Sequence, residues 1–226
     1  MRLLIAKVLF TALVLCLGTG AVMAQAAADT PPAARPAVPR TIFRDSDGNL
    51  VTNNEFVDIR MANPSYPDRT IIKTLEDGTI EFRLQKIPQE GAEIPALDLR
   101  TLDGRRTSAA ELRGKVLVIN LWFIGCPPCM AEIPKLNDLA AKFDDSPDVR
   151  FVALTVDSED KVKSFLRRER FDYEMVPAAQ AEMSKFVFSG YPKNIVVGRD
   201  GKIVYWRSTI RAWDKFESVI RGEIAK

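Results

Sequence analysis

A stretch in the middle of the chain combines a strand, two closely spaced cysteines and a helix. Residues 117–123 are apolar and rich in β-branched side chains, and they lead directly into Cys126-Pro-Pro-Cys129. Such a run predicts a buried strand. The apolar residues that follow recur at the spacing of one helix face: Ile133, Leu136, Leu139, Ala140 and Phe143. A Cys-x-x-Cys pair between a strand and a helix is typical of a redox couple.

The spacing of the two cysteines predicts different roles for their sulfurs. Cys126 lies at the start of the expected helix and Cys129 lies one turn inside it, so the two can form a disulfide. Unpaired N–H groups and the positive end of the helix dipole favour a thiolate on Cys126. Because Pro127 and Pro128 have no N–H group, the N–H of Cys129 is the expected donor to that sulfur. Cys129 is expected to be the more buried of the pair.

The first 24 residues have the pattern of a secretory signal peptide. Arg2 and Lys7 precede an apolar run over residues 8–20, and cleavage is expected between Ala24 and Gln25. An uncleaved anchor is the alternative, but residues 8–24 are about three residues short of a comfortable membrane span. Cleavage would remove Cys16 and bring the formal net charge from +2 to zero. With no basic patch, nucleic acid is not an expected partner.

The rest of the chain divides into three parts. Residues 25–40 are rich in alanine and proline and predict a poorly ordered linker. Residues 41–90 predict a β-rich extension, in which Asp47-Gly48 and Asp77-Gly78 mark the turns of two hairpins. Residues 91–226 predict a domain of alternating strands and helices, with a parallel sheet covered on both faces. A short helix is expected to begin near Ser108.

The cysteine motif and two sites downstream resemble those of a known family. Trp122-Phe-Ile-Gly-Cys-Pro-Pro-Cys129, Glu132 and Gly190-Tyr191-Pro192 are similar to residues of the exported thioredoxin-like disulfide reductases, such as TlpA and ResA. The resemblance covers about residues 91–226 and implies a thioredoxin-like α/β fold. The cysteine pair would be the redox centre itself, so no cofactor is implied. The chain departs from the family at Gly125, where a tryptophan is common, which leaves the substrate preference open.

Glu132 is the expected proton-transfer group. In thioredoxin a buried aspartate lies six residues before the first cysteine, but this chain has the amide Asn120 there, which cannot act as a base. Glu132 matches the active-site glutamate of the family and lies three residues beyond Cys129. A partly buried carboxylate there would have a raised pKa and could exchange protons with Cys129. The alternative is a side chain on a solvated helix face.

The resemblance also indicates how a substrate would be held. Pro192 matches a cis-proline of the family that faces the two sulfurs, although about one X–Pro bond in twenty is cis in general. It would expose the backbone of Tyr191 for pairing with an extended substrate segment. Pro127 and Trp122 are further candidates for substrate contact, although a tryptophan at this place is more often part of the core.

The expected function is thiol–disulfide exchange in the bacterial cell envelope. Cys126 would attack a disulfide of an envelope protein, and Cys129 would resolve the mixed disulfide. Cytochrome c maturation and disulfide repair are the candidate tasks, and a membrane electron donor with its own cysteine pair would recharge the protein. A metal is not expected, because Zn²⁺ takes about four ligands and the chain has no histidine. A thiol oxidase or isomerase of the same fold, and a non-catalytic thioredoxin-like binding module with an inert disulfide, remain alternatives.

Overall fold

The structure is a computed structural model that describes residues 38–62, 70–108 and 111–226. The expected signal peptide, Cys16 and the linker up to residue 37 lie outside the described residues. Residues 39–226 form one compact unit. Across the described ranges, no helix combines the length and the apolar character that a membrane crossing requires.

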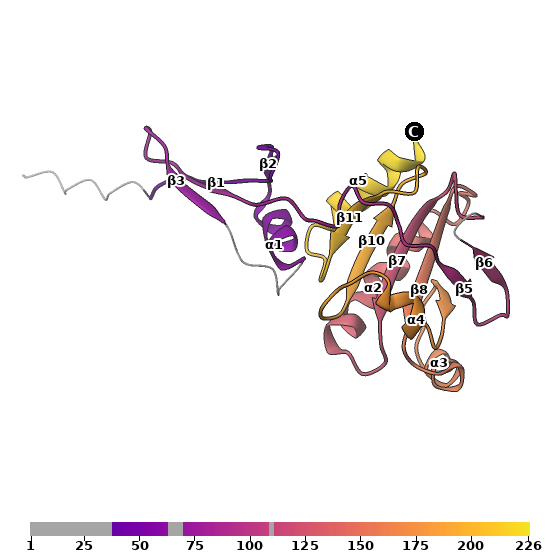
Figure 1. Ribbon diagram of the computed structural model, residues 1–226. Coiled ribbons are helices and arrows are strands. Elements are labelled where there is room, and N and C mark those ends of the chain that lie inside the picture. The colour runs from indigo at the N-terminus through magenta and orange to yellow at the C-terminus, as the bar shows by residue number, and fades with distance from the viewer. Residues whose placement is uncertain (1–37, 63–69, 109–110) are drawn as a thin grey trace, which may run out of the picture. The chain divides into compact units, whose positions relative to one another are not determined.

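The centre of the part of the chain after the extension is a sheet of five strands in the order β11-β10-β7-β8-β9 (Figure 1). The strands are β7 (Val116–Trp122), β8 (Val149–Thr155), β9 (Glu174–Val176), β10 (Lys193–Val197) and β11 (Ile203–Arg207). β7, β8 and β9 run parallel, whereas β10 is antiparallel to both β7 and β11. The sheet is therefore mixed: the expected parallel pairing holds for β7, β8 and β9, whereas β10 and β11 form an antiparallel hairpin at its edge. A tight turn at Asp200-Gly201 joins β10 to β11, and a turn this short can connect only antiparallel strands.

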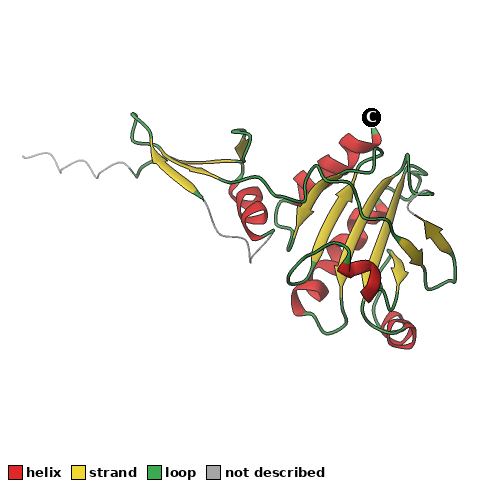
Figure 2. Ribbon diagram, in the orientation of Figure 1, coloured by secondary structure: helices red, strands yellow, loops and turns green. Residues whose placement is uncertain are grey.

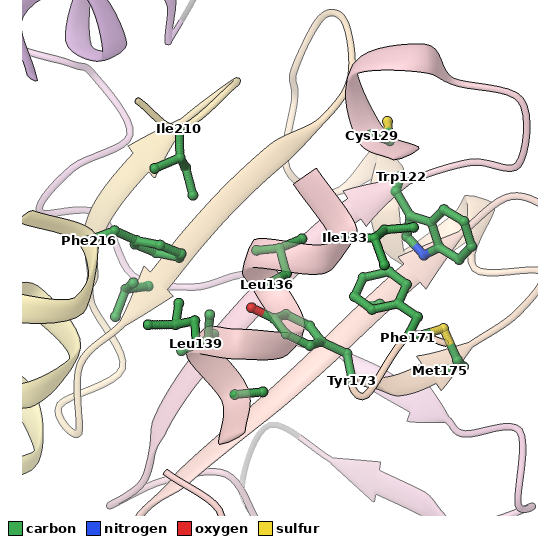
Figure 3. Close-up of a cluster of buried hydrophobic side chains, with 14 of the residues drawn as sticks. Trp122, Cys129, Ile133, Leu136, Leu139, Phe171, Tyr173, Met175, Ile210 and Phe216 are labelled. Carbon is green, nitrogen blue, oxygen red and sulfur yellow. The ribbon is translucent and has the colours of Figure 1, made fainter. Parts of the chain in front are cut away.

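Helices cover both faces of this sheet, as expected (Figure 2). Side chains of β7 alternate between two apolar clusters, because successive residues of a strand point to opposite faces. α2 (Pro127–Ala141), α3 (Glu159–Leu166) and α5 (Trp213–Ile224) pack on one face. α4 (Gln180–Ser184) packs on the other. Figure 3 shows the first cluster beneath Cys129, where the apolar side of α2 meets Phe171, Tyr173 and Phe216. All the residues predicted for that side of α2 are buried.

The helix expected near Ser108 is wrong for the residues described there. β6 (Arg106–Ser108) pairs with β5 (Asp98–Arg100), and residues 111–114 form turns. The capping signal was real, since the N–H of Ser108 donates to Glu111 at 2.6 Å and the N–H of Glu111 donates to Ser108 Oγ at 3.4 Å. Gly114, at a φ of +80°, then turns the chain into β7, so no helix continues through residues 111–114.

The extension contains both predicted hairpins and a helix that was not predicted. β1 (Thr41–Arg44) pairs with β2 (Leu50–Val51), and β3 (Ile71–Thr74) pairs with β4 (Ile80–Arg83), each antiparallel. β1 also pairs with β4 in parallel, which joins the hairpins into one sheet. The unpredicted helix is α1 (Asn53–Met61), capped where Thr52 Oγ1 accepts the N–H of Glu55 at 3.2 Å. Phe43, Phe56 and Phe82 pack together between this helix and the small sheet.

Candidate active site

The two cysteines form a disulfide at the start of α2. Their Cα atoms lie 5.3 Å apart, and Cys126 is the N-cap of the helix. Its sulfur accepts the N–H of Cys129 at 3.3 Å, as predicted, while Pro127 and Pro128 occupy the first helical positions. Each cysteine exposes 2 % of its surface, so the greater burial expected for Cys129 is not seen in this disulfide form. The N-cap position places Cys126 against the positive end of the α2 dipole.

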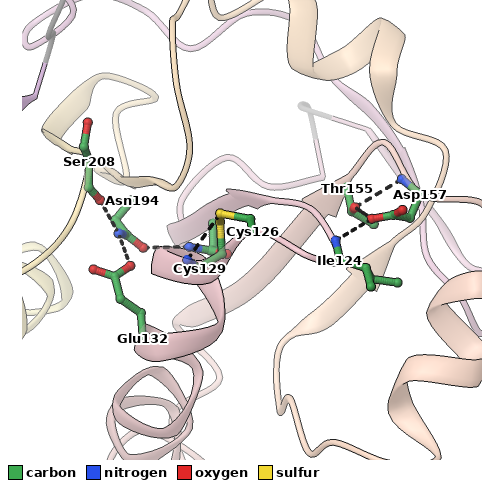
Figure 4. The surroundings of a disulfide bond; sticks show 9 residues. Ile124, Cys126, Cys129, Glu132, Thr155, Asp157, Asn194 and Ser208 are labelled. Carbon is green, nitrogen blue, oxygen red and sulfur yellow. Dashed lines mark hydrogen bonds between the residues drawn. A yellow bond between two sulfur atoms is a disulfide. The ribbon is translucent and has the colours of Figure 1, made fainter.

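Glu132 is buried one turn of α2 beyond Cys129, which rules out the solvated-face alternative. Its carboxylate accepts the N–H of Ile210 at 2.5 Å. It also accepts Nδ2 of Asn194 at 3.0 Å (Figure 4). Burial raises its pKa to about 7, against the lowering effect of these two donors. A carboxyl that titrates near neutral pH can either accept or release a proton there.

Two amides fix the hydrogen bonds around this carboxyl. Asn120 of β7 donates Nδ2 to Oδ1 of Asn194 at 2.8 Å, and both residues are buried. Asn194 also donates to the carbonyl of Ser208 at 2.8 Å. Because Oδ1 of Asn194 is occupied by Asn120, its NH₂ group is the part turned toward Glu132. Asn194 was missed from the sequence, since only strand pairing brings β10 beside β7.

A second group missed from the sequence holds the loop before Cys126. Oδ2 of Asp157 accepts the N–H of Ile124 at 2.6 Å and the hydroxyl of Thr155 at 2.9 Å. Asp157 follows the end of β8, and β8 is parallel to β7, so both carboxyl ends meet at the same edge of the sheet. The sequence signal was an acid directly after a buried strand, and the parallel pairing gives it this place beside the redox loop.

The segment before β10 carries the second landmark of the motif. The Tyr191–Pro192 bond is cis, as the resemblance implied, and Pro192 is buried. The Tyr191 ring is half-buried and packs edge-on against Phe123 at 5.1 Å and Phe188 at 5.2 Å between ring centroids. Tyr191 therefore joins the loop before Cys126 to the segment before Pro192.

The profile of the Redoxin family matches residues 89–214, more than half of the chain. The chain belongs to the Redoxin family. The matched segment contains the disulfide, Glu132, Asn194 and the cis-proline, so the site described above lies entirely within the family domain. The extension with α1 lies outside it.

The chain is similar to curated thiol-disulfide oxidoreductases, and it shares its fold with solved structures. The chain is 27% identical over 145 residues to the thiol-disulfide oxidoreductase ResA of Bacillus thuringiensis (strain Al Hakam), covering 60% of this chain and 83% of the relative. The thioredoxin-like protein YneN of Bacillus subtilis is 26% identical over 117 residues, covering 51% and 69%. A thiol:disulfide interchange protein of Chlorobium tepidum has the same fold, with a TM-score of 0.52 at 21% identity over 61% of this chain and 99% of its own. For a thiol:disulfide interchange protein of a Bacteroides species, the TM-score is 0.51 at 24% identity, covering 59% and 90%.

Trp122 lies in the core, the alternative given for it, and its buried side chain offers no surface for the substrate contact that was its other candidate role. Its side chain is 0 % exposed and packs against Phe165 at 5.2 Å between ring centroids. It also packs against Phe171 at 5.3 Å (Figure 3). Trp122 is the last residue of β7 and belongs to the same core cluster as Cys126 and Cys129, so it stabilises the loop that carries them from its buried side. Pro127 is exposed beside the disulfide and remains a candidate for substrate contact. Within the described ranges, no group of three Cys, Asp or Glu is placed to hold a metal ion.

Proposed function

We propose that this protein is a thiol:disulfide oxidoreductase of the bacterial cell envelope that reduces protein disulfides through Cys126 and Cys129. The observation that carries the proposal is the disulfide at the N-terminus of α2, with the sulfur of Cys126 accepting the N–H of Cys129. The N-terminus of a helix stabilises the thiolate of Cys126, both when that thiolate attacks a disulfide and when it is the leaving group. The thiol-disulfide oxidoreductase ResA is similar along this region. The signal-like composition of residues 1–24 supports export.

The reaction starts from the dithiol. The Cys126 thiolate attacks one sulfur of a substrate disulfide, which breaks that bond, forms a mixed disulfide and releases one substrate thiolate. Cys129 then loses its proton and attacks the Cys126 sulfur, which frees the second substrate thiolate and forms the Cys126–Cys129 disulfide. Two electrons pass to the substrate, and its thiolates take up two protons. A membrane donor with its own cysteine pair would return the protein to the dithiol.

Glu132 is the proposed proton acceptor for Cys129. A carboxyl group with a pKa of about 7 is ionised in part at neutral pH, and it lies one turn from Cys129 along α2. An intervening water is the proposed carrier, because the carboxylate faces Asn194 and Ile210. Tyr191 and Pro192 are proposed to align the substrate backbone, with Pro127 forming part of the contact surface beside the sulfur.

The first test is reduction of insulin disulfides by the parent protein and by the Cys126→Ser variant. Activity in the parent and none in the variant is the expected result, and equal background activity in both would favour a non-catalytic module. The Cys129→Ser variant should accumulate a mixed disulfide with its substrates, because the resolving thiol is missing. Substrates captured this way would show whether cytochrome c maturation or disulfide repair is the task.

The direction of electron flow is tested by the reduction potential of the cysteine pair, equilibrated against a glutathione or dithiothreitol series. A potential below about −220 mV is expected for a reductase, whereas a value of roughly −120 mV is that of a strong oxidant. The second result would favour a thiol oxidase of the same fold and overturn the reducing direction.

A further inference from the structure

The extension reaches the redox site through one buried acid on α1. Asp58 is 1 % exposed, and its Oδ2 accepts the N–H groups of Arg211 at 2.7 Å and of Ala212 at 2.8 Å. The residue directly before them, Ile210, donates its N–H to Glu132. Three consecutive N–H groups are therefore divided between two carboxylates, one from α1 and one from α2. A shift of the chain between β11 and α5 would therefore break hydrogen bonds to Asp58, to Glu132 or to both.

The end of α1 is bound to the same neighbourhood by a buried lysine. Nζ of Lys193 donates to the carbonyl of Ala62 at 2.7 Å and to Oγ of Ser208 at 2.6 Å. Ser208 in turn donates to the carbonyl of Met61 at 2.9 Å. Lys193 is fully buried and directly follows Pro192. A helix C-terminus is a favourable acceptor for a cation, so the end of α1 stabilises the charge of this buried lysine.

The charge of Asp58 also acts on Glu132. Burial is the main cause of the raised pKa of Glu132, and the negative charge of Asp58 raises it further. Burial raises the pKa of Asp58 as well, while its two N–H donors and the guanidinium groups of Arg207 and Arg211 oppose that effect. No described residue donates to its other oxygen, Oδ1. Two buried tyrosines also lie near this pair: the charge of Glu132 acts on Tyr173, and the charges of both acids act on Tyr205. Arg207, whose charge acts on Asp58, is itself paired with Glu90.

We infer that α1 of the extension is a positioning element of the redox site, in which Asp58 fixes residues 210–212 and thereby holds Glu132 in place. The Redoxin match begins at residue 89, so this acid comes from outside the family domain. The inference rests on the proposed role of Glu132 in proton transfer. Asp58 itself acts through Ile210 and Glu132 and contacts neither sulfur in the hydrogen bonds of the described residues.

The test compares Asp58→Asn with Asp58→Ala in the full chain. An asparagine can still accept the N–H groups of Arg211 and Ala212 but carries no charge, whereas alanine removes both the acceptor and the charge. Glu55→Gln is the matched control, because Glu55 lies on the same helix but pairs at 3.4 Å with the half-exposed Lys215. The readouts are the titration of the Glu132 carboxyl carbon by NMR, hydrogen exchange of the Ile210 amide, and the pH profile of insulin reduction.

In Asp58→Asn, the titration midpoint of Glu132 should fall, and the pH profile should move to lower pH with it. In Asp58→Ala, exchange of the Ile210 amide should be about 10-fold faster, because the segment loses its anchor. The kcat/KM for insulin should fall by about 10-fold through misplacement of Glu132. Glu55→Gln should match the parent within about twofold in every readout.

Unchanged Glu132 titration in Asp58→Asn, together with unchanged Ile210 exchange in a folded Asp58→Ala, would overturn the inference. If Asp58→Ala does not fold, the isosteric Asp58→Asn still decides through the titration midpoint and the pH profile. Titration and exchange need no substrate, so they remain readable even if the parent fails to reduce insulin. That failure would count against the proposed function alone.

Discussion

Asn120 and Asn194 face each other across β7 and β10, and Nδ2 of Asn120 donates to Oδ1 of Asn194 at 2.8 Å. This bond sets the orientation of Asn194, whose own NH₂ group then faces Glu132 at 3.0 Å and the carbonyl of Ser208 at 2.8 Å. One side-chain amide, oriented by a second, therefore donates to an ionisable carboxyl that also accepts the N–H of Ile210. The hydrogen bonds favour the ionised form only weakly against burial, which leaves the pKa of Glu132 at about 7.

Asn120→Asp should destabilise the protein at high pH. The new carboxylate would face Oδ1 of Asn194, and turning that amide to relieve the repulsion would take the donor away from Glu132. Leaving a buried acceptor without its donor costs on the order of 1–3 kcal/mol, and more for a charged group. Urea unfolding at about pH 8 should show a loss of at least that size. At about pH 4 the introduced carboxyl is protonated and can donate, so the difference from the parent should nearly vanish; an equal loss at both pH values would contradict the argument.

Glu132→Gln should remove a pH dependence of stability. The folded pKa of about 7 lies above the ordinary value of 4.5, so the folded protein holds a proton that the unfolded chain has lost. The contribution of Glu132 is therefore fully present below about pH 4.5 and is lost as pH rises toward 7. The free energy of unfolding of the parent, relative to the variant, should fall by on the order of 3 kcal/mol across this range. Parallel urea midpoints for both proteins from about pH 4.5 to 8 would contradict it.

Lys193→Met should show the opposite sign at alkaline pH. Burial lowers the pKa of Lys193 from 10.5 to about 8, so the folded protein gives up this proton before the unfolded chain does. Stability attributed to Lys193 is therefore lowest below about pH 8 and rises as pH approaches 10.5. The parent should gain on the order of 3 kcal/mol relative to the variant over that interval. Chemical unfolding of both proteins at several alkaline pH values tests this, and a difference that does not change with pH would refute it.

Asp157→Ala should slow disulfide exchange without removing either sulfur. The loop before Cys126 would lose the acceptor for the N–H of Ile124. A small misplacement of a reacting group is costly, and we expect about a 10-fold loss of kcat/KM for insulin reduction. Asp157→Asn keeps an acceptor and should stay within about threefold of the parent. If the asparagine variant were as slow as the alanine variant, the charge of Asp157 would matter rather than its hydrogen bond.

The parts of this protein that could be predicted from sequence are those encoded locally. The strand over residues 116–122, the cysteine pair and the buried side of α2 follow from short-range periodicity and spacing, and the two Asp-Gly turns follow from backbone preference. The cis bond before Pro192 came from the family resemblance, because no local preference requires it.

The parts that were missed depend on contacts between distant residues. Asp58 bonds to residues 153 and 154 positions away, and Asn194 bonds to Glu132 across 62 positions. The spacing of apolar residues within one segment cannot predict hydrogen bonds between residues so far apart in the sequence. α1 was missed for a different reason: Asn53 and Asn54 favour turns, and Thr52, which caps the helix, also continues the β pattern of Leu50 and Val51. Trp122, a candidate for substrate contact by its motif position, is core because both faces of β7 are buried.

The parallel pairing of β1 with β4 gives α1 a different status from that of a free N-terminal arm. It joins residues 41–44 to residues 80–83, so the chain from 45 to 79 forms a closed loop with α1 inside it. A helix tethered at both ends behaves as an intramolecular ligand with a high effective concentration, and dilution cannot remove it. Separation of β1 from β4 would therefore weaken the hydrogen bonds between Asp58 of α1 and the segment that binds Glu132. If α1 positions Glu132 as inferred, reciprocity requires that a change of protonation at Glu132 would alter the stability of that closed loop.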